Sequence, residues 1–212
     1  VAIVDPFYWF IPLVALAWGG RRHWWPGMWW SLLLLPPLLL VTISRTPLLW
    51  VKLASAAIAI AGVIGWHRHW FGPAARRAAA LAALGLLAVY TLAQVAVGTV
   101  VQQRAHRAAV ARFGPAATSG ALTVPGRPFH WDVMIASRDT VAGDGWSVPR
   151  HLDDPIVRRA LASDAGIAMS HFARFLVAVV DTTPSGPEVQ FRDVRYARMA
   201  RMGFATRRVR VP

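Results

Sequence analysis

The ionisable side chains of this sequence are concentrated in its second half. Residues 1–103 contain seven of the 23 Lys and Arg residues but only one of the ten acidic residues, Asp5. The stretches between these charges are long and apolar, and the whole chain is 56% hydrophobic with a mean hydropathy of +0.41. An ordinary soluble domain has a more even mixture of charged and apolar residues. The first half is therefore predicted to lie in a membrane, and the second half to be a basic soluble domain.

Apolar runs in the first half have lengths close to that of a bilayer. A spanning helix needs about 20 predominantly apolar residues. We predict about four transmembrane helices, at residues 3–18, 28–43, 48–66 and 78–101. Most of the 11 Trp residues lie at the edges of these runs, where an aromatic belt is expected. Tyr90 and Gln94 share one face of the last run and are expected to point inward.

The rest of the chain is predicted to be a small soluble α+β domain. A basic helical extension at 104–114 would stop at Gly114-Pro115, and residues 115–212 would form the domain. Asp154, directly before Pro155, has the sequence of a helix N-cap. Further elements are predicted as a linker at 115–120, a half-buried strand at 129–137, a short helix including 170–175, and strands at 175–183, 188–197 and 204–211. The predicted fold class is thus membrane all-α followed by α+β.

The net charge and the absence of cysteine limit the kinds of partner and metal site that the chain can have. The chain has no Cys, which excludes disulfides and thiolate metal sites. A net charge of +13 is compatible with nucleic acid or with anionic lipid headgroups, and basic residues beside apolar runs favour the headgroups. We therefore expect the lipid bilayer and anionic headgroups as partners and regard nucleic acid as disfavoured. The C-terminal domain is expected on the cytoplasmic side, because the basic run after the last span continues into it.

Asp5 is the candidate site residue. Asp before Pro at the start of a helix is an N-cap worth about 0.5–2 kcal/mol, and the same pair recurs at Asp154-Pro155. An acid at the membrane edge is also a candidate metal ligand or catalytic group. The two roles are compatible, and both remain open.

Histidines provide weaker candidates for a metal site. His67 and His69 form a His-x-His pair that could bind zinc, but flanking Trp residues favour an interfacial loop. His130 and Asp132 alternate on one face of a predicted strand, for which a solvated face is the simpler interpretation.

Three short motifs resemble a known family. Val4-Asp5-Pro6 precedes a span, Arg127-Pro128-Phe129 with Trp131 opens the tail domain, and Asp193-Val194-Arg195-Tyr196 lies near the end. This order resembles the bacterial inner-membrane proteins described as LexA-binding, inner-membrane-associated, metal-dependent hydrolases. The resemblance implies an inner-membrane location and a divalent metal of unknown identity, with Asp5 as one ligand. The family's His-Arg-Gly-x-Thr-His-Ser stretch belongs upstream of the first motif and does not occur in these 212 residues. We therefore expect the chain to be the C-terminal portion of such a protein.

Two functional hypotheses follow. In the first, the chain is an inner-membrane protein of the hydrolase type without its own complete metal site, and is inactive alone. In the second, it is a non-enzymatic membrane anchor that presents a basic α+β domain to a cytoplasmic protein partner or to anionic headgroups. The substrate, orientation and oligomeric state are left open by the sequence.

Overall fold

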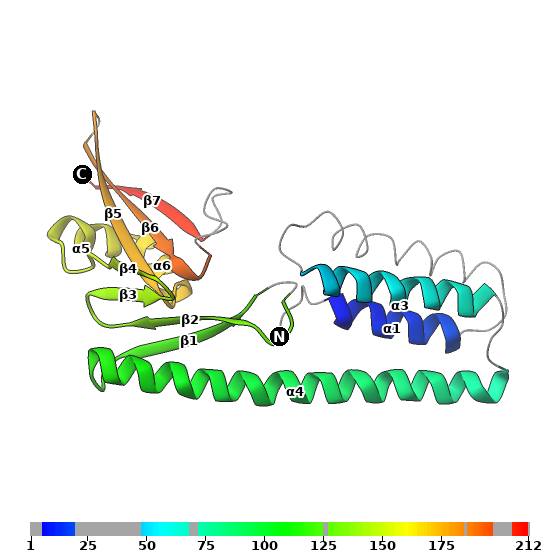
Figure 1. Cartoon of the computed structure of the whole chain (residues 1–212). Coiled ribbons are helices and arrows are strands. Elements are labelled where there is room, and N and C mark those ends of the chain that lie inside the picture. Colours follow the sequence, from blue (N-terminus) through cyan, green and yellow to red (C-terminus); the bar gives the residue numbers. More distant parts are fainter. Residues whose placement is uncertain are drawn as a thin grey trace. The chain divides into compact units, whose positions relative to one another are not determined.

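A computed structural model describes residues 6–19, 48–67, 72–124, 127–184, 186–196 and 205–211 (Figure 1). The chain divides into two compact units. Unit 1 contains Val1–Thr99 and Thr123–Trp131, and unit 2 contains Val100–Leu122 and Asp132–Pro212. The loop that joins the first two strands thus belongs with the N-terminal helices, and each unit has its own packing.

Two apolar helices pack side by side in unit 1. They are α1, Pro6–Gly19, and α3, Leu49–His67 (Figure 1). Phe10 and Ala59 are buried between them, with Leu13, Ile58 and Val63 around them. Gly62 permits the close approach, because a Cβ at this position would lie 2.7 Å from Cγ2 of Val14. The predicted span at 28–43 lies outside the described residues.

The longest element is α4, Pro73–Phe113, which has 41 residues. It includes the predicted span at 78–101 and the predicted basic extension in one uninterrupted helix of about 60 Å. Gly114 follows it with φ of +86°, and the Gly114 N–H donates to the Val110 carbonyl at 2.8 Å. A glycine in this left-handed conformation is a common helix stop, so the predicted end at Gly114 is confirmed.

The prediction of about four transmembrane helices followed by a soluble domain is wrong. In the part of the chain that the structure describes, one helix, α4, is long and apolar enough to cross a membrane. At 1.5 Å per residue the 14 residues of α1 extend about 21 Å, and the apolar stretch Leu49–Ile64 of α3 about 24 Å. Both are shorter than a hydrocarbon core of about 30 Å. The apolar content of residues 3–18 and 48–66 is typical of transmembrane helices, but the apolar helices that form there are too short to cross the bilayer.

Unit 2 contains two antiparallel sheets. The first has the order β1-β2-β3-β4, with strands Thr118–Thr123, Trp131–Ala136, Thr140–Gly143 and Trp146–Pro149. The second has the order β5-β6-β7, with strands Leu176–Thr183, Gly186–Asp193 and Thr206–Arg210. Residues alternate between the two faces of β5, and both faces are used. Leu176 and Ala178 belong to one core cluster, whereas Phe175 and Val177 join Met134, Ala136 and Val141 of the first sheet in another.

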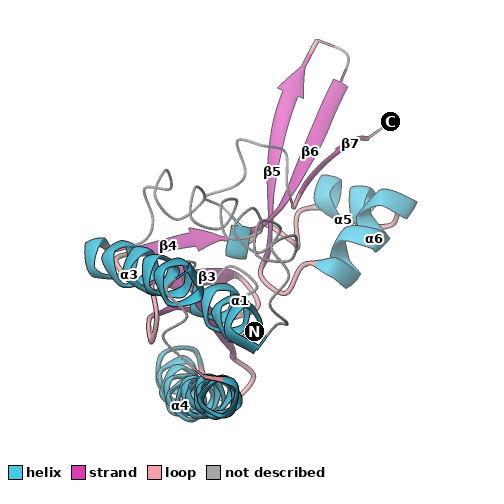
Figure 2. Ribbon diagram, turned by 90° about the vertical axis from the view of Figure 1, so that its right-hand side faces the viewer, coloured by secondary structure: helices cyan, strands magenta, loops and turns pink. Residues whose placement is uncertain are grey.

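Two short helices lie beside the second sheet (Figure 2). They are α5, Pro155–Leu161, and α6, Asp164–Phe172. Val157 and Met169 from these helices are buried with Val189 and Phe191 of β6. Asp154 caps α5 as predicted, since its Oδ1 accepts from the Ile156 N–H at 2.7 Å.

Several predicted boundaries in unit 2 need correction. The predicted linker at 115–120 contains the start of β1, and the helix expected to include 170–175 ends at Phe172. The strand expected at 188–197 ends at Asp193. In β2 the buried residues are Met134 and Ala136, whereas Val133 and Ile135 of the apolar alternation are only half-buried. The hairpin of β3 and β4 was not predicted at all.

Arg150 joins the two sheets of unit 2. Its carbonyl accepts from the Ala178 N–H at 3.0 Å, and its Nε donates to the Leu176 carbonyl at 2.9 Å. A further bond runs from Nη1 to the Ser137 carbonyl at 3.0 Å. Partial burial lowers the pKa of this guanidinium, which still stays far above neutral pH. Arg150 therefore supplies hydrogen bonds to the outer edge of β5 in the place of a further strand.

Gly166 in α6 offers a test of this packing. A Cβ there would lie 2.6 Å from Leu161 Cα and would also collide with the Ala160 carbonyl, both of which are backbone atoms that cannot rotate away. We expect Gly166→Ala to destabilise unit 2 by about 1–3 kcal/mol. Thermal unfolding of the full chain in detergent, followed by hydrogen exchange of α5 and α6, measures this.

The matched control for this prediction is Gly85→Ala in α4. No atom lies within 4 Å of a Cβ at that position, so the same change should be neutral or slightly stabilising. Equal effects of the two substitutions would contradict the packing of α6 against α5.

Candidate functional site

An aromatic cluster lies where α1 begins, directly after Asp5 in the sequence. Phe7 stacks on Trp50 at the start of α3, with ring centroids 6.3 Å apart. Tyr90 of α4 packs edge-on against Phe7 at 5.6 Å, and Tyr8 lies at the same distance from Tyr90. Phe129, from the loop between β1 and β2, contacts the same Tyr90 ring at 5.6 Å. We call these five residues the aromatic cluster; all of them belong to unit 1.

Polar side chains near the aromatic cluster bond within the protein. The Tyr8 hydroxyl donates to Thr91 Oγ1 at 3.1 Å, and the Thr91 hydroxyl donates to the Leu87 carbonyl at 2.8 Å. Gln94 Nε2 donates to the Tyr90 hydroxyl at 2.9 Å. Tyr90 thus faces other parts of unit 1, as predicted, and Gln94 bonds Tyr90 one turn away on the same helix. Further along α4, the Thr99 hydroxyl donates to the Val95 carbonyl at 2.8 Å, so this hydroxyl is also satisfied by the helix itself.

The predicted metal ligands are not brought together by the described residues. Asp5 and His69 lie outside them, and His67 is the last residue of α3. His130 is exposed and precedes β2, whereas Asp132 is half-buried within it. Within the described ranges no group of three His or acidic residues could hold a metal ion. The metal role of Asp5 therefore remains a hypothesis.

The most highly bonded acid in the described residues is Asp193, at the end of β6. Its side chain is fully buried. One oxygen accepts from the Arg195 N–H at 3.0 Å, and the other from Arg195 Nε at 2.8 Å and the Arg174 N–H at 3.2 Å. Arg195 Nη2 lies 2.6 Å from this second oxygen and also donates to the Phe172 carbonyl at 3.0 Å. The carboxylate thus fastens the end of β6 to the end of α6.

Arg195 is held between a carboxylate and two aromatic rings. Its guanidinium carbon lies 5.9 Å from the Phe172 ring centroid and 5.2 Å from that of Tyr196, and the two rings stack at 6.1 Å. Asp193 raises the pKa of Arg195 above its ordinary value, so the guanidinium stays charged. The hydrogen-bond distances place Asp193 and Arg195 in bonds to each other and to the backbone at the ends of β6 and α6, so we assign the pair a structural role. In the sequence, Asp193 and Arg195 belong to one of the three motifs that carry the family resemblance. Their spacing of two residues also fits an Asx-type turn, in which the Asp side chain bonds the backbone two residues on.

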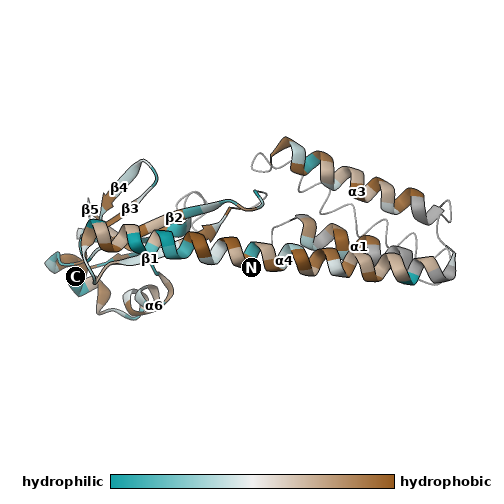
Figure 3. Cartoon of the chain, turned by 60° about the horizontal axis from the view of Figure 1, so that its bottom comes forward, coloured by the Kyte–Doolittle hydropathy of each residue, from teal (hydrophilic) through white to brown (hydrophobic). Residues whose placement is uncertain are grey.

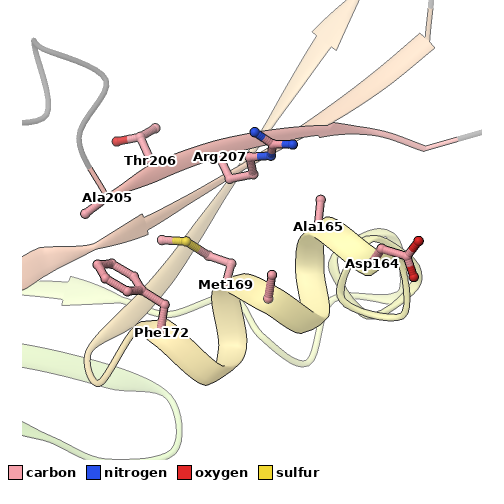
Figure 4. Close-up of a pocket in the computed structure, with 8 residues that line it drawn as sticks. Asp164, Ala165, Met169, Phe172, Ala205, Thr206 and Arg207 are labelled. Carbon is pink, nitrogen blue, oxygen red and sulfur yellow. The ribbon is translucent and has the colours of Figure 1, made fainter.

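A shallow hollow lies between α6 and β7 (Figure 4). Met169 and Phe172 form its apolar floor, and Asp164 and Arg207 bring one charge of each sign. Ala165, Ala168, Ala205 and Thr206 complete the lining. Among the described lining residues, one carboxylate, one guanidinium and the Thr206 hydroxyl suit recognition of a polar group.

Substitution of Asp193 tests whether a buried carboxylate contributes more to the stability of unit 2 than an exposed one. Asp193→Asn removes the buried carboxylate and leaves the partly exposed Arg195 guanidinium without its charged partner, and we expect a loss of about 1.5–3 kcal/mol in the stability of unit 2. Chemical unfolding of the full chain in detergent measures this loss.

Asp153→Asn is the matched control. Asp153 pairs with Arg138 at 2.9 Å, but both side chains are well exposed. Such a pair contributes at most about 1 kcal/mol, so this change should have little effect. A small effect of both substitutions would contradict the structural role of Asp193.

Comparisons with known proteins identify no relatives for this chain. No protein-family model matches the sequence. No curated protein and no solved structure is significantly similar to it. The function therefore has to be argued from the geometry of the two units.

Proposed function

We propose that the chain is a membrane anchor in which α4 crosses the bilayer and carries a basic α+β domain at the membrane surface. The observation that carries this proposal is the exposed apolar surface of α4. Large side chains point outward along the helix at nearly every turn: Leu81, Leu84, Leu86, Val89, Leu92, Val95, Val97 and Val100. Leu92 is the most exposed of them, at 68%.

Such a surface is unfavourable in water. Burial of one Leu or Val side chain contributes about 1.5–3 kcal/mol, and the side chains concerned are roughly half exposed. Together they forgo on the order of 10 kcal/mol, which is comparable with the whole stability of a domain. Figure 3 shows the apolar residues of α3 and α4 in brown, with polar residues of α4 in teal beside β1 and at the opposite end of the helix. In unit 1, Leu49, Trp50, Leu53 and Ile60 of α3 are exposed as well, which supports an apolar surrounding for this unit.

The length and flanks of the apolar stretch match a bilayer. Residues 78–101 of α4 contain no ionisable side chain except Tyr90, and extend about 36 Å. This exceeds a hydrocarbon core of about 30 Å. Arg76 and Arg77 precede the stretch, and Arg104 and Arg107 follow it. Basic residues at both ends can reach the headgroups while the apolar residues lie in lipid.

The part of α4 beyond this stretch belongs to the soluble domain. Ala105 and Ala109 are buried, and Gln102 bonds β1 in both directions: its Nε2 donates to Ser119 Oγ at 3.2 Å, and its Oε1 accepts from the Ala121 N–H at 2.9 Å. On the outer side of the same turns, Arg104 and Arg107 are exposed. Their charge is placed where it can attract anionic headgroups, which act over about one Debye length of 8–10 Å.

A charge placed in the apolar stretch tests the proposal. The Leu86 side chain is exposed near the centre of α4, and an arginine in the middle of a span costs about 2.5–3.5 kcal/mol. We expect the unaltered chain to remain with the membrane in alkaline carbonate, and Leu86→Arg to be released or to fail to insert.

Ala108→Arg is the matched control for this experiment. Ala108 is also exposed on α4 but lies in its basic part, so the added charge should leave membrane retention unchanged. Release of the unaltered chain by carbonate would refute the anchor.

A further inference from the structure

The loop between β1 and β2 is closed by its own backbone. The Val124 N–H donates to the His130 carbonyl at 3.1 Å, and the Arg127 N–H donates to the Val124 carbonyl at 3.1 Å. The His130 N–H then donates to the Arg127 carbonyl at 3.2 Å. Pro128 has no N–H to satisfy. A loop with so many internal bonds can lie near lipid at low cost, because lipid supplies no partners for free backbone groups.

This loop contacts α4 at two levels, both within unit 1. Phe129 packs against Tyr90 at 5.6 Å between ring centroids. The Trp131 ring lies over Gly98, where a Cβ would be 3.4 Å from Trp131 Cζ2. The two contacts are about 12 Å apart along the helix. Both Tyr90 and Gly98 lie in the uncharged stretch of α4, so the loop runs alongside the part that the proposed function places in the bilayer.

Phe129 has an unusual backbone conformation and is partly exposed. Its φ is +58°, a left-handed conformation that is uncommon for an aromatic residue, and 44% of it is exposed. Residues held in such conformations cluster at functional sites, where the surrounding structure offsets their cost. The conformation holds the ring against Tyr90 but does not bury it, so part of an apolar ring is left for another environment.

The depth of the loop in the bilayer follows from its position along α4. Arg77 marks one edge of the apolar stretch, and Gly98 is about 32 Å further along the helix. A hydrocarbon core of about 30 Å that begins at Arg77 therefore ends near Gly98, at the level of Trp131. Phe129, at the level of Tyr90, lies up to about 10 Å inside this edge, which is the depth that interfacial apolar residues reach. Exposed Arg127 and His130 are then close enough to extend toward the headgroups.

We propose that residues 127–131 form a lipid-contact loop, in which Phe129 enters the acyl region of the bilayer and Arg127 and His130 meet the phosphates of anionic phospholipids. This rests on the proposed function, because it takes the crossing of α4 as its reference. The loop then fixes how deeply α4 is inserted. Trp131 occupies the interface, where indole rings are favoured.

Site-specific fluorescence tests the proposal, since the chain has no native Cys to interfere. Phe129→Cys in the full chain is labelled with an environment-sensitive fluorophore and reconstituted in phosphatidylcholine–phosphatidylglycerol vesicles. Lipids with a nitroxide near the headgroup or near the end of the acyl chain then quench the label according to depth. We expect a greater loss of fluorescence with the shallow nitroxide than with the deep one. His130→Cys, labelled in the same way, retains Phe129 and should give the same order.

Two reference sites make the outcomes distinguishable. Leu86→Cys, inside the stretch of α4, should be quenched more by the deep nitroxide, and Asp144→Cys, in the turn between β3 and β4, by neither. Quenching at Leu86 without quenching at Phe129 and His130 would overturn the lipid-contact loop and leave the anchor intact. Deeper quenching at Phe129 than at Leu86 would also overturn it. An unquenched Leu86 label would refute the anchor itself.

Discussion

Apolar side chains of α4 that the described residues leave exposed impose the main constraint on this structure. The exposed Leu and Val residues of α4 have to be removed from water by something other than the described fold. The same helix becomes basic after Val101 and packs against β1 through Gln102, without an interruption between the two parts. One continuous helix thus changes from an apolar to a charged surface near Val101.

Local signals in the sequence predicted individual elements well. Asp154-Pro155 and Gly114-Pro115 specify the start of α5 and the end of α4, because an N-cap and a left-handed glycine act through neighbouring backbone atoms. The hairpin of β3 and β4 was missed, although Asp144-Gly145 is a strong turn signal. Its strands are only four residues long, too short for a clear alternation.

Features that depend on tertiary contacts were predicted less well from the sequence. The number of spans was overestimated because α1 is short and α3 is apolar over only part of its length. The alternation of apolar residues in β2 did not predict which face of the strand is buried. The buried Met134 and Ala136 pack with Phe175 and Val177, which are distant in the sequence. Asp193 is buried because Arg195 and the Arg174 N–H bond it, and no local pattern gives the position of Arg174. The aromatic cluster likewise joins residues from four separate segments.

The hydrogen bonds of Arg150 to β5 affect whether copies of the protein can pair through this sheet edge. In the proposed membrane anchor, confinement to the bilayer would raise the local concentration of identical domains, and a free sheet edge would allow one copy to pair with the next. Along the first part of β5 this pairing is blocked, because Ala178 and Leu176 already bond the backbone and side chain of Arg150. A guanidinium cannot be extended by a further strand as an ordinary edge can. One arginine thus protects the first part of this sheet edge from pairing with another strand and leaves a positive charge there.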